Sequence, residues 1–392
     1  MGYFLEAFAR FTADAQGRGV RGNQVRMLGF DLLEFSDQGV VFGVGDLRLV
    51  EYVVAVFVVA DGLPQLAGPF ACGHVAIILN SIGLKIIAHS LQRIAIIFNP
   101  FAGGLKGPNR ARLDAAVDTL KRAGRTVELF PTTGPNMAGE LGRVAIDRDF
   151  DLLLAAGGDG TINEVLNGIV GSQIVFGALP SGTANVLANE VGLSGRPDRA
   201  AGELLGAVPV RIGVGAFDQT GQARRHFLLM AGVGLDARIV HELDLDLKKK
   251  IGKLSYWHGG FKQLGRDMPR FRIRVGEVER EASFALVSRV RNYGGDFEIA
   301  KSVRLTDSDF EIVIQEKQHG LDFVKFVANV ALNRLKHADG VTVLRGTEAV
   351  LTPVGTGEFH VQTDGEAVGV GASRISMVPD AVTLLLPKKY VG

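Results

Sequence analysis

The sequence predicts an α/β domain with a Rossmann-like parallel sheet, followed by a β-sandwich domain. From Arg93 to about Val208, short apolar runs alternate with stretches of helical spacing, which is typical of βαβ units. Two glycine-rich loops follow consecutive apolar runs in this part. Beyond it, apolar runs succeed one another with only two helical stretches, near residues 235–264 and 321–335. This second pattern favours a mostly β domain of sandwich type.

The periodicity places each element. Short apolar runs predict buried strands in the first domain, at Ile94–Phe98, Thr126–Phe130, Asp151–Ala156 and Ile174–Leu179. Helical spacing predicts helices between them, at Ala111–Ala123, Met137–Ile146, Asn163–Ile169 and Ala184–Val191. In the second domain we expect strands at Phe227–Ala231, Phe271–Val275, Ala282–Val287, Phe310–Ile314, Gly340–Arg345, Phe359–Val361 and Ala381–Leu386.

The chain divides into three parts by these criteria. Residues 1–92 show no clear alternation of helical and strand periods. We expect them to be a dispensable accessory extension, disordered, or sequence upstream of the true start. The α/β domain is expected at residues 93–208 and the β-rich domain at residues 209–380.

Composition excludes several classes of protein. The 392 residues carry a net charge of +1, with 47% hydrophobic and 22% charged residues, as in globular proteins of two or three domains. The near-zero charge argues against a nucleic-acid partner. The single cysteine, Cys72, rules out an internal disulfide and fits a reducing compartment. Residues 62–84 lack charged side chains, but their prolines and glycines argue against a membrane span.

The first glycine-rich loop is the most informative segment. Gly157, Gly158, Asp159, Gly160 and Thr161 follow an apolar run and precede a helix. Glycines let backbone N–H groups approach an anion closely, and a helix N-terminus adds partial positive charge there. Asp159 is suited to hold Mg²⁺ on phosphate oxygens. The alternative is a tight turn between strand and helix, with Thr161 as the N-cap.

A second loop has the same character. It contains Gly182, Thr183 and Asn185 and also follows a strand. Asn99 follows the first strand of the domain, so all three segments are expected at one sheet edge, where α/β proteins bind ligands. The sequence has no G-x-x-x-x-G-K-[ST] motif and no complete G-x-G-x-x-G motif. An ordinary P-loop is therefore excluded, and a dinucleotide site of Rossmann type is disfavoured.

Taken in order, these motifs resemble the diacylglycerol kinase catalytic-domain superfamily, which includes bacterial lipid kinases, sphingosine kinases and ceramide kinases. The resemblance spans about Arg93 to Leu386. The matching segments are Asn99–Gly104, Gly157–Glu164, Pro180–Asn185, Gly232–Ala237, Lys248–Tyr256, Tyr293–Gly295 and Asp364–Glu366. It implies an ATP-binding α/β domain and a β-sandwich with the active site between them. It also implies that residues 381–392 return to the first domain.

The resemblance assigns roles on the nucleotide side. ATP and Mg²⁺ are the implied cofactors, with the glycines and Thr161 around the phosphates and Asp159 organising the metal. Asn163, Thr183 and Asn185 offer further hydrogen bonds. Thr132 is a candidate nucleotide contact, with a plain turn residue as an equal alternative.

On the acceptor side, either Asp364 or Glu366 is expected to be the general base. The alternative for this motif is an ordinary Asp-Gly hairpin turn. Asp236 matches the family's acceptor-side aspartate, with a helix N-cap as the alternative.

The sequence departs from the family at several positions. Val186 and Arg211 stand where many members have aspartate, and Lys301 replaces a proline. Asp307-Ser308-Asp309 replaces an Asp-Gly pair that is linked in some members to a structural Mg²⁺. Asp307 is accordingly a candidate metal ligand.

The segment from Lys248 to Arg274 contains nine Lys or Arg residues and one acidic residue, a net charge of +8. We expect it to dock on an anionic membrane, with Trp257 and Phe261 at the interface; a solvated face is the alternative.

The function indicated is an ATP-dependent lipid kinase of phospholipid biosynthesis, at a cytoplasmic membrane face, acting on a lipid such as diacylglycerol or a sphingoid base. The alternatives are a soluble kinase of the NAD-kinase type and a non-catalytic lipid-binding protein on a kinase scaffold. The assembly is left open, with a homodimer as one alternative.

Overall fold

The computed structural model describes residues 91–235, 237, 269–293, 297–331, 334–335 and 338–392, together with short strands among the first 90 residues. The chain forms two compact units, Met1–His89 and Ser90–Gly392. In the first unit the described strands pair as three antiparallel two-stranded sheets. They are β1 (Arg26–Met27) with β2 (Phe30–Asp31), β3 (Glu34–Ser36) with β4 (Gly39–Val41), and β5 (Val54–Phe57) with β6 (Ala76–Leu79).

The second unit begins with a parallel sheet in the order β10-β9-β7-β8. Its strands are β7 (Arg93–Phe98), β8 (Thr126–Pro131), β9 (Leu152–Gly157) and β10 (Val175–Pro180). The residues of β9 and β10 are all buried, as expected for strands covered by helices on both faces.

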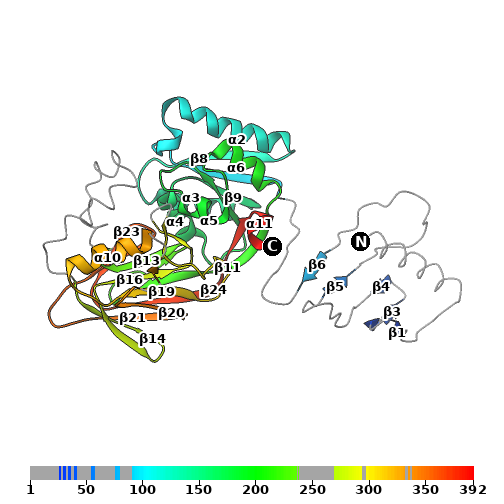
Figure 1. Cartoon of the computed structure of the whole chain (residues 1–392). Helices are drawn as coiled ribbons and strands as arrows, with labels where there is room; N and C mark the ends of the chain where they lie inside the picture. Colours follow the sequence, from blue (N-terminus) through cyan, green and yellow to red (C-terminus); the bar gives the residue numbers. More distant parts are fainter. Residues whose placement is uncertain are drawn as a thin grey trace. The chain divides into compact units, whose positions relative to one another are not determined.

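The helices that cover this sheet pack in pairs. The helical segments are η1 (Gly103–Leu105), η2 (Gly107–Asn109), α2 (Arg110–Arg122), α3 (Met137–Asp147), α4 (Asp159–Ile169), α5 (Val186–Val191) and α6 (Pro197–Leu204). Helix α2 packs against α6, and α3 packs against α4 (Figure 1). The connections place the N-termini of α4 and α5 directly after β9 and β10.

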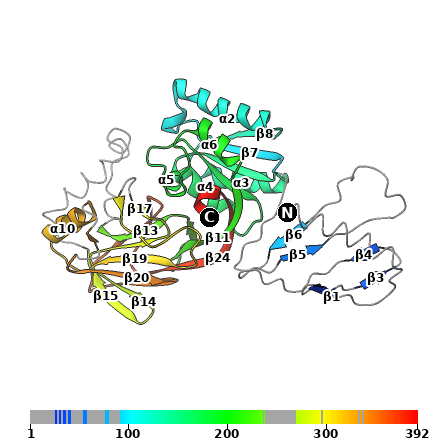
Figure 2. The same cartoon turned by 45° about the vertical axis from the view of Figure 1, so that its right-hand side comes forward.

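The remaining strands form a β-sandwich. One layer is a six-stranded sheet in the order β20-β19-β16-β13-β22-β23. The opposing layer contains β15, β14, β21, β24, β11 and β12. The two layers lie face to face (Figure 2). Side chains of both layers, including Phe227, Phe271, Phe310 and Phe359, form one apolar core. These two layers confirm the predicted fold class.

The bounds of these strands are as follows. The first are β11 (Val208–Asp218), β12 (Arg225–Phe227), β13 (Met230–Gly234), β14 (Phe271–Val275), β15 (Val278–Ala282) and β16 (Phe284–Ser288). They are followed by β19 (Phe310–Gln315), β20 (Val341–Gly346), β21 (Glu348–Pro353), β22 (His360–Thr363), β23 (Glu366–Val370) and β24 (Ser373–Leu386). A short pair, β17 (Asn292–Tyr293) and β18 (Phe297–Glu298), and two helices, α10 (Gly320–Ala331) and α11 (Lys388–Val391), complete the unit.

Strand β24 belongs both to the parallel sheet and to the β-sandwich. Its second half pairs in parallel with β10, where Val175 lies opposite Thr383. Its first half pairs with β21, and β11 lies antiparallel to it along most of its length. The parallel sheet and one layer of the sandwich are therefore a single ten-stranded sheet (Figure 1).

Several elements differ from the sequence prediction. Strands β11, β15, β21 and β23 were not predicted, and β24 begins at Ser373 rather than at Ala381. Helix α4 begins at Asp159 rather than Asn163, because a glycine-rich start carries little helical periodicity. The run Phe227–Ala231 is split between β12 and β13. Helix α6 was not predicted. The helical stretch expected near residues 235–264 lies almost wholly outside the described residues.

No helix in the described part of the chain is both long and apolar enough to cross a membrane.

Candidate active site

The loops after β7, β9 and β10 meet at the carboxyl edge of the parallel sheet. The backbone N–H of Asn99 donates to the carbonyl of Ala156 (3.1 Å), and that of Ser181 donates to Gly157 (2.8 Å). The N–H of Gly104 donates to the carbonyl of Ser181 (2.9 Å). Three loops predicted to share an edge are thus joined by backbone hydrogen bonds.

Two glycines allow the closest of these contacts. A Cβ atom on Gly182 would lie 2.5 Å from the Cα of Gly158 and 3.0 Å from Oδ1 of Asn185. Real Cβ atoms essentially never come as close as 2.5 Å to another heavy atom, so this position in the second loop requires glycine. Because Gly158 and Gly182 have no side chains, the backbone groups of both loops lie at the surface where the loops meet.

The first loop leads directly into helix α4. Gly158 is its N-cap residue, and no side chain caps the helix. The first-turn N–H groups of a helix lack partners within the helix, and together with the helix dipole they attract anions. Thr161 is only 9% exposed and packs over Gly157, so it lies inside the first turn rather than at the N-cap.

Asp159 connects the first loop to helix α5. Its Oδ2 accepts a hydrogen bond from the N–H of Val186 (3.1 Å), and its Oδ1 accepts one from Leu187 (3.3 Å). Burial raises the pKa of this carboxyl above 3.8, the hydrogen bonds from Val186 and Leu187 oppose the rise, and the neighbouring charge of Asp364 adds to it. Asp159 therefore places α5 and carries a charge that a nearby cation would stabilise.

Other candidate nucleotide contacts shape the loops. Asn185 has a left-handed backbone (φ 46°), and its Oδ1 accepts a hydrogen bond from the N–H of Gly182 (2.8 Å). Oδ1 of Asn99 accepts one from the N–H of Phe101 (2.8 Å). Thr183 is exposed in the second loop, whereas Thr132 is 6% exposed just beyond β8.

Asp364 and Gly365 are the two turn residues of the β22–β23 hairpin. Thr363 pairs with Glu366 across the turn, and both turn residues have positive φ, 48° and 84°. This is the geometry of a two-residue turn of type I′, for which Asp-Gly is a preferred sequence. The hairpin alternative is therefore correct as a description of the backbone, and the side chains determine what else the turn does.

The Asp364 carboxylate is held by four hydrogen bonds. Oδ1 accepts from the N–H groups of Leu229 (2.9 Å) and Met230 (3.0 Å), and Oδ2 accepts from the N–H of Leu228 (2.8 Å) and Nδ2 of Asn163 (2.8 Å). Burial raises the pKa of Asp364, and these hydrogen bonds oppose the rise. The break between β12 and β13 exists where these three N–H groups turn toward the carboxylate.

Asn163 links the two domains. Its side chain is in α4 and only 1% of the residue is exposed. Nδ2 donates to Asp364 and to the carbonyl of His226 (3.0 Å), so both amide hydrogens are used within the protein. The structure thus places Asn163 in a bridge to the hairpin, instead of at the surface expected for a nucleotide contact.

Glu366 lies beside the first loop. Its Oε1 is 3.4 Å from the position that a Cβ atom on Gly160 would occupy. Its Oε2 accepts a hydrogen bond from Nη2 of Arg225 (2.9 Å). The structure therefore brings Glu366 to the opening of α4 and brings the Asp364 carboxylate to Asn163 within that helix.

Two arginines near the site were not predicted. Nothing in the local sequence distinguishes Arg225. Arg289 is fully buried, and burial lowers its pKa to about 10. It donates to the carbonyls of Leu228 (3.1 Å) and Leu305 (2.6 Å). A charged residue within the apolar run 284–290 was a usable signal, because buried charges need partners.

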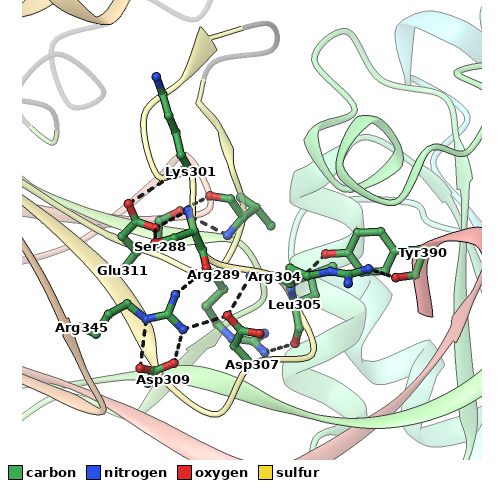
Figure 3. A network of polar contacts seen from close by, with 12 residues as sticks. Ser288, Arg289, Lys301, Arg304, Leu305, Asp307, Asp309, Glu311, Arg345 and Tyr390 are labelled. Carbon is green, nitrogen blue, oxygen red and sulfur yellow. Dashed lines mark hydrogen bonds and ion pairs between the residues drawn. The ribbon is translucent and has the colours of Figure 1, made fainter. Parts of the chain in front are cut away.

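Asp307 lies in an ion-pair network that does not fit a metal ion. Nη2 of Arg345 donates to Oδ2 of Asp307 (2.8 Å), and Nε donates to Oδ2 of Asp309 (3.0 Å) (Figure 3). Nη1 of the same arginine donates to the carbonyl of Ser302 (2.8 Å). The Arg345 guanidinium therefore binds the carboxylate of Asp307, which was predicted to be a metal ligand. The described ranges contain no group of three or more His, Cys, Asp or Glu side chains arranged to hold a metal.

The structure shows the contacts of two residues that depart from the family pattern, Val186 and Arg211. The N–H of Val186 is one of the donors to Asp159. Arg211 donates to the carbonyls of Asp380 (2.8 Å) and Ser172 (2.6 Å), beside the pairing of β10 with β24. Asp236 and residues 248–268 of the basic segment lie outside the described residues.

Comparison with known proteins agrees with this architecture. Residues 93–217 match the diacylglycerol kinase catalytic domain, and residues 230–386 match the YegS C-terminal NAD kinase beta sandwich-like domain. A diacylglycerol kinase of Bacillus subtilis (strain 168) is 29% identical over 311 residues, which are 76% of this chain and 98% of the relative. A diacylglycerol kinase of Staphylococcus haemolyticus is 30% identical over 235 residues, 57% of this chain and 67% of the relative.

A crystal structure of a diacylglycerol kinase from Bacillus anthracis str. Sterne has the same fold. The TM-score is 0.62 at 20% identity, and the alignment covers 77% of this chain and 99% of the other. The two family segments together cover both domains around the glycine loops. The chain therefore belongs to the diacylglycerol kinase catalytic-domain family of kinases.

Proposed function

We propose that the chain is an ATP-dependent lipid kinase that transfers the γ-phosphate to a hydroxyl group of a membrane lipid such as diacylglycerol or a sphingoid base. One observation carries the proposal: a carboxylate of the sandwich, Glu366, lies beside Gly160 at the opening of α4. A phosphate-binding edge and a proton acceptor from a different domain are what phosphoryl transfer to an alcohol needs.

On the nucleotide side, the first-turn N–H groups of α4 and the paired loops around Gly158 and Gly182 would receive the phosphates. Mg²⁺ bound with ATP would neutralise charge on the transferring phosphoryl group. Asp159 fits such an ion, because it is a carboxylate at the same helix start and its repulsion with Asp364 would be relieved by a cation.

On the acceptor side, we assign Glu366 as the general base and Asp364 as the residue that positions the hairpin. A carboxylate has about four lone-pair sites, and four hydrogen bonds already occupy those of Asp364. Glu366 would take the proton of the lipid hydroxyl as the hydroxyl oxygen bonds to the γ-phosphorus, while the bond from that phosphorus to ADP breaks and ADP leaves. Arg225 would stabilise the charge of Glu366 before that transfer.

We also propose that the enzyme binds the cytoplasmic face of an anionic membrane peripherally. The +8 charge of residues 248–274 supports this. Within the segment, Arg270 pairs with Glu281 and Arg272 with Glu279 and Glu281, so these two arginines contribute less to lipid attraction than their formal charges suggest.

The test is a radiolabelled-ATP assay over diacylglycerol, sphingoid base, ceramide and phosphatidylglycerol, presented in vesicles with and without anionic lipid, with soluble NAD as a further acceptor. We expect a lipid product that increases on anionic vesicles. Phosphorylation of NAD with no lipid product would overturn the proposal and favour the soluble alternative suggested by the description of the sandwich domain.

Amide variants separate the two carboxylates. Glu366→Gln is expected to lower turnover by at least ~10²-fold with an unchanged melting temperature. Asp364→Asn is expected to lower turnover and the melting temperature together, because an amide NH₂ would face backbone donors. Glu358→Gln, at an exposed carboxylate just before β22, is the matched control. Wild-type turnover in Glu366→Gln would contradict the assignment.

A further inference from the structure

Helix α5 ends on a buried carboxylate that the proposed chemistry does not use. Glu190, in its last turn, is only 2% exposed. A buried carboxylate is stable only where hydrogen-bond donors replace water. Oε2 of Glu190 accepts from the backbone N–H of Arg291 (2.9 Å), and Oε1 accepts from the hydroxyl of Tyr390 (2.9 Å).

Tyr390 belongs to the C-terminal helix α11 and is 6% exposed. Its hydroxyl also accepts a hydrogen bond from the N–H of Leu305 (3.0 Å). The guanidinium of Arg304 lies over its ring, 4.9 Å from the centroid, and donates to its carbonyl (Figure 3). The hydroxyl of Tyr390 therefore joins three parts of the chain: α5, the C-terminal helix and the segment before β19. Tyr390 lies 85 residues after Leu305 and 200 residues after Glu190 in the sequence.

The segment before β19 is itself firmly held. Arg345 binds Asp307 and Asp309, and Glu311 accepts hydrogen bonds from the N–H groups of Lys301 (3.1 Å) and Ser302 (2.7 Å) (Figure 3). The carbonyl of Leu305 accepts from buried Arg289. Tyr390 is consequently anchored on a rigid part of the sandwich.

Helix α5 depends on such anchors. It has six residues, too few to be stable by itself. Asp159 holds its first turn, and Glu190 holds its last turn. The second glycine loop, residues 181–185, enters α5 directly, so a shift of the helix would move that loop.

We propose that Tyr390 and Glu190 are positioning residues through which the C-terminal helix and the sandwich fix α5, and with it the second glycine loop, in the arrangement that binds ATP. The inference rests on the proposed function, because it assumes that the loops bind ATP. Tyr390 bonds to Glu190 in the last turn of α5 and acts on the loop only through that helix.

The experiment uses the full chain and compares Tyr390→Phe with Lys388→Ala, an exposed residue of the same helix. We expect Tyr390→Phe to weaken ATP binding, measured by titration calorimetry without acceptor, about three- to tenfold. The KM for ATP should rise similarly, while the KM for the lipid and the affinity of Lys388→Ala stay unchanged. A lower melting temperature with unchanged ATP affinity would show a merely structural role and overturn the inference.

Glu190→Gln provides a second test. Its effect on ATP affinity and that of Tyr390→Phe should be less than additive in the double variant, because both alter the same contact between Glu190 and Tyr390. If Glu190→Gln does not fold, Tyr390→Phe decides alone, since phenylalanine keeps the packing. Failure of the wild type to bind ATP would overturn the proposed function together with this inference, whereas unchanged binding in Tyr390→Phe overturns this inference only.

Discussion

Asp159 and Asp364 come from different domains, and each has a raised pKa because it is buried. Backbone N–H groups, rather than an arginine in direct contact, donate hydrogen bonds that replace water around each carboxylate. Burial makes the charged form less stable than it is in water, and the mutual repulsion that raises the pKa of Asp159 adds to this. Two buried carboxylates with raised pKa values, at the edge where the glycine loops meet, are typical of a functional site.

A pH dependence of stability follows for Asp159. Its pKa in the folded protein lies above its ordinary value of 3.8, so the folded state holds the proton more tightly than the unfolded state. The contribution of this residue to the free energy of unfolding therefore falls as pH rises from about 4 through the raised pKa. Asp159→Asn removes this dependence, so the variant should lose less stability than the wild type as pH rises.

Urea unfolding of the wild type and of Asp159→Asn at pH 4 and pH 7 measures how the free energy of unfolding of each protein changes with pH. In a separate kinase assay, the turnover of Asp159→Asn should be sharply lower than that of the wild type. A wild type that gains stability relative to the variant over this range would show that the carboxylate is stabilised in the folded state, and the argument would fail.

The role of Asn163 could not be predicted at this scale. The sequence places it correctly within a helix that follows the glycine loop, although that helix begins four residues earlier, at Asp159. Its partner Asp364 lies 201 residues later, and a pairing over that distance leaves no local pattern. The same holds for Arg345 and Asp307, which are 38 residues apart. Motifs indicate which residues matter, but the fold decides which residues meet.

At the scale of elements, the two glycine loops act as one unit because Gly158 and Gly182 are in contact. Gly182→Ala would place a methyl group 2.5 Å from the Cα of Gly158. The loops would have to separate, at a cost of about 1–3 kcal/mol of stability. The KM for ATP should rise, because both backbones that we propose to bind the phosphates would move.

The matched control is Gly103→Ala in the loop after β7, where a Cβ atom would meet nothing within 4 Å. Thermal unfolding and ATP kinetics of the two variants provide the comparison, and the control should stay within about 0.5 kcal/mol of the wild type. Equal behaviour of both variants would show that the close contact of the loops is unimportant.

The success of the sequence prediction at this scale has a simple cause. Strands β7, β9 and β10 are covered on both faces, so their sequences are unbroken apolar runs that cannot be confused with loops. The first turn of α4 lacks such a pattern, since two of the residues from Gly158 to Thr161 are glycines without an apolar side chain. Periodicity therefore missed the start of this helix, which lies at the candidate site.

For the whole molecule, the kinase fold lies entirely within the unit Ser90–Gly392. Family similarity begins at residue 93, and the Bacillus subtilis relative is covered over 98% of its length by 76% of this chain. We expect a chain that starts at Ser90 to keep the melting temperature and the ATP-dependent activity of the full protein.

Calorimetric unfolding and the lipid-kinase assay of the truncated chain check this expectation, with the full chain prepared in parallel. Loss of folding or of activity in the shorter chain would mean that residues 1–89 contribute to the kinase unit, and the description of this segment as an accessory extension would have to be abandoned.

Strand β24 has a consequence for biosynthesis. It occupies the middle of the ten-stranded sheet, between β10 and β21, yet it is among the last segments of the chain to be made. Chains emerge from the ribosome N-terminus first. Until residues 373–386 are released, β10 and β11 must wait with unpaired edges, which are prone to wrong pairing. A chain whose synthesis stops before Ser373 would thus leave both halves of the kinase without their shared strand.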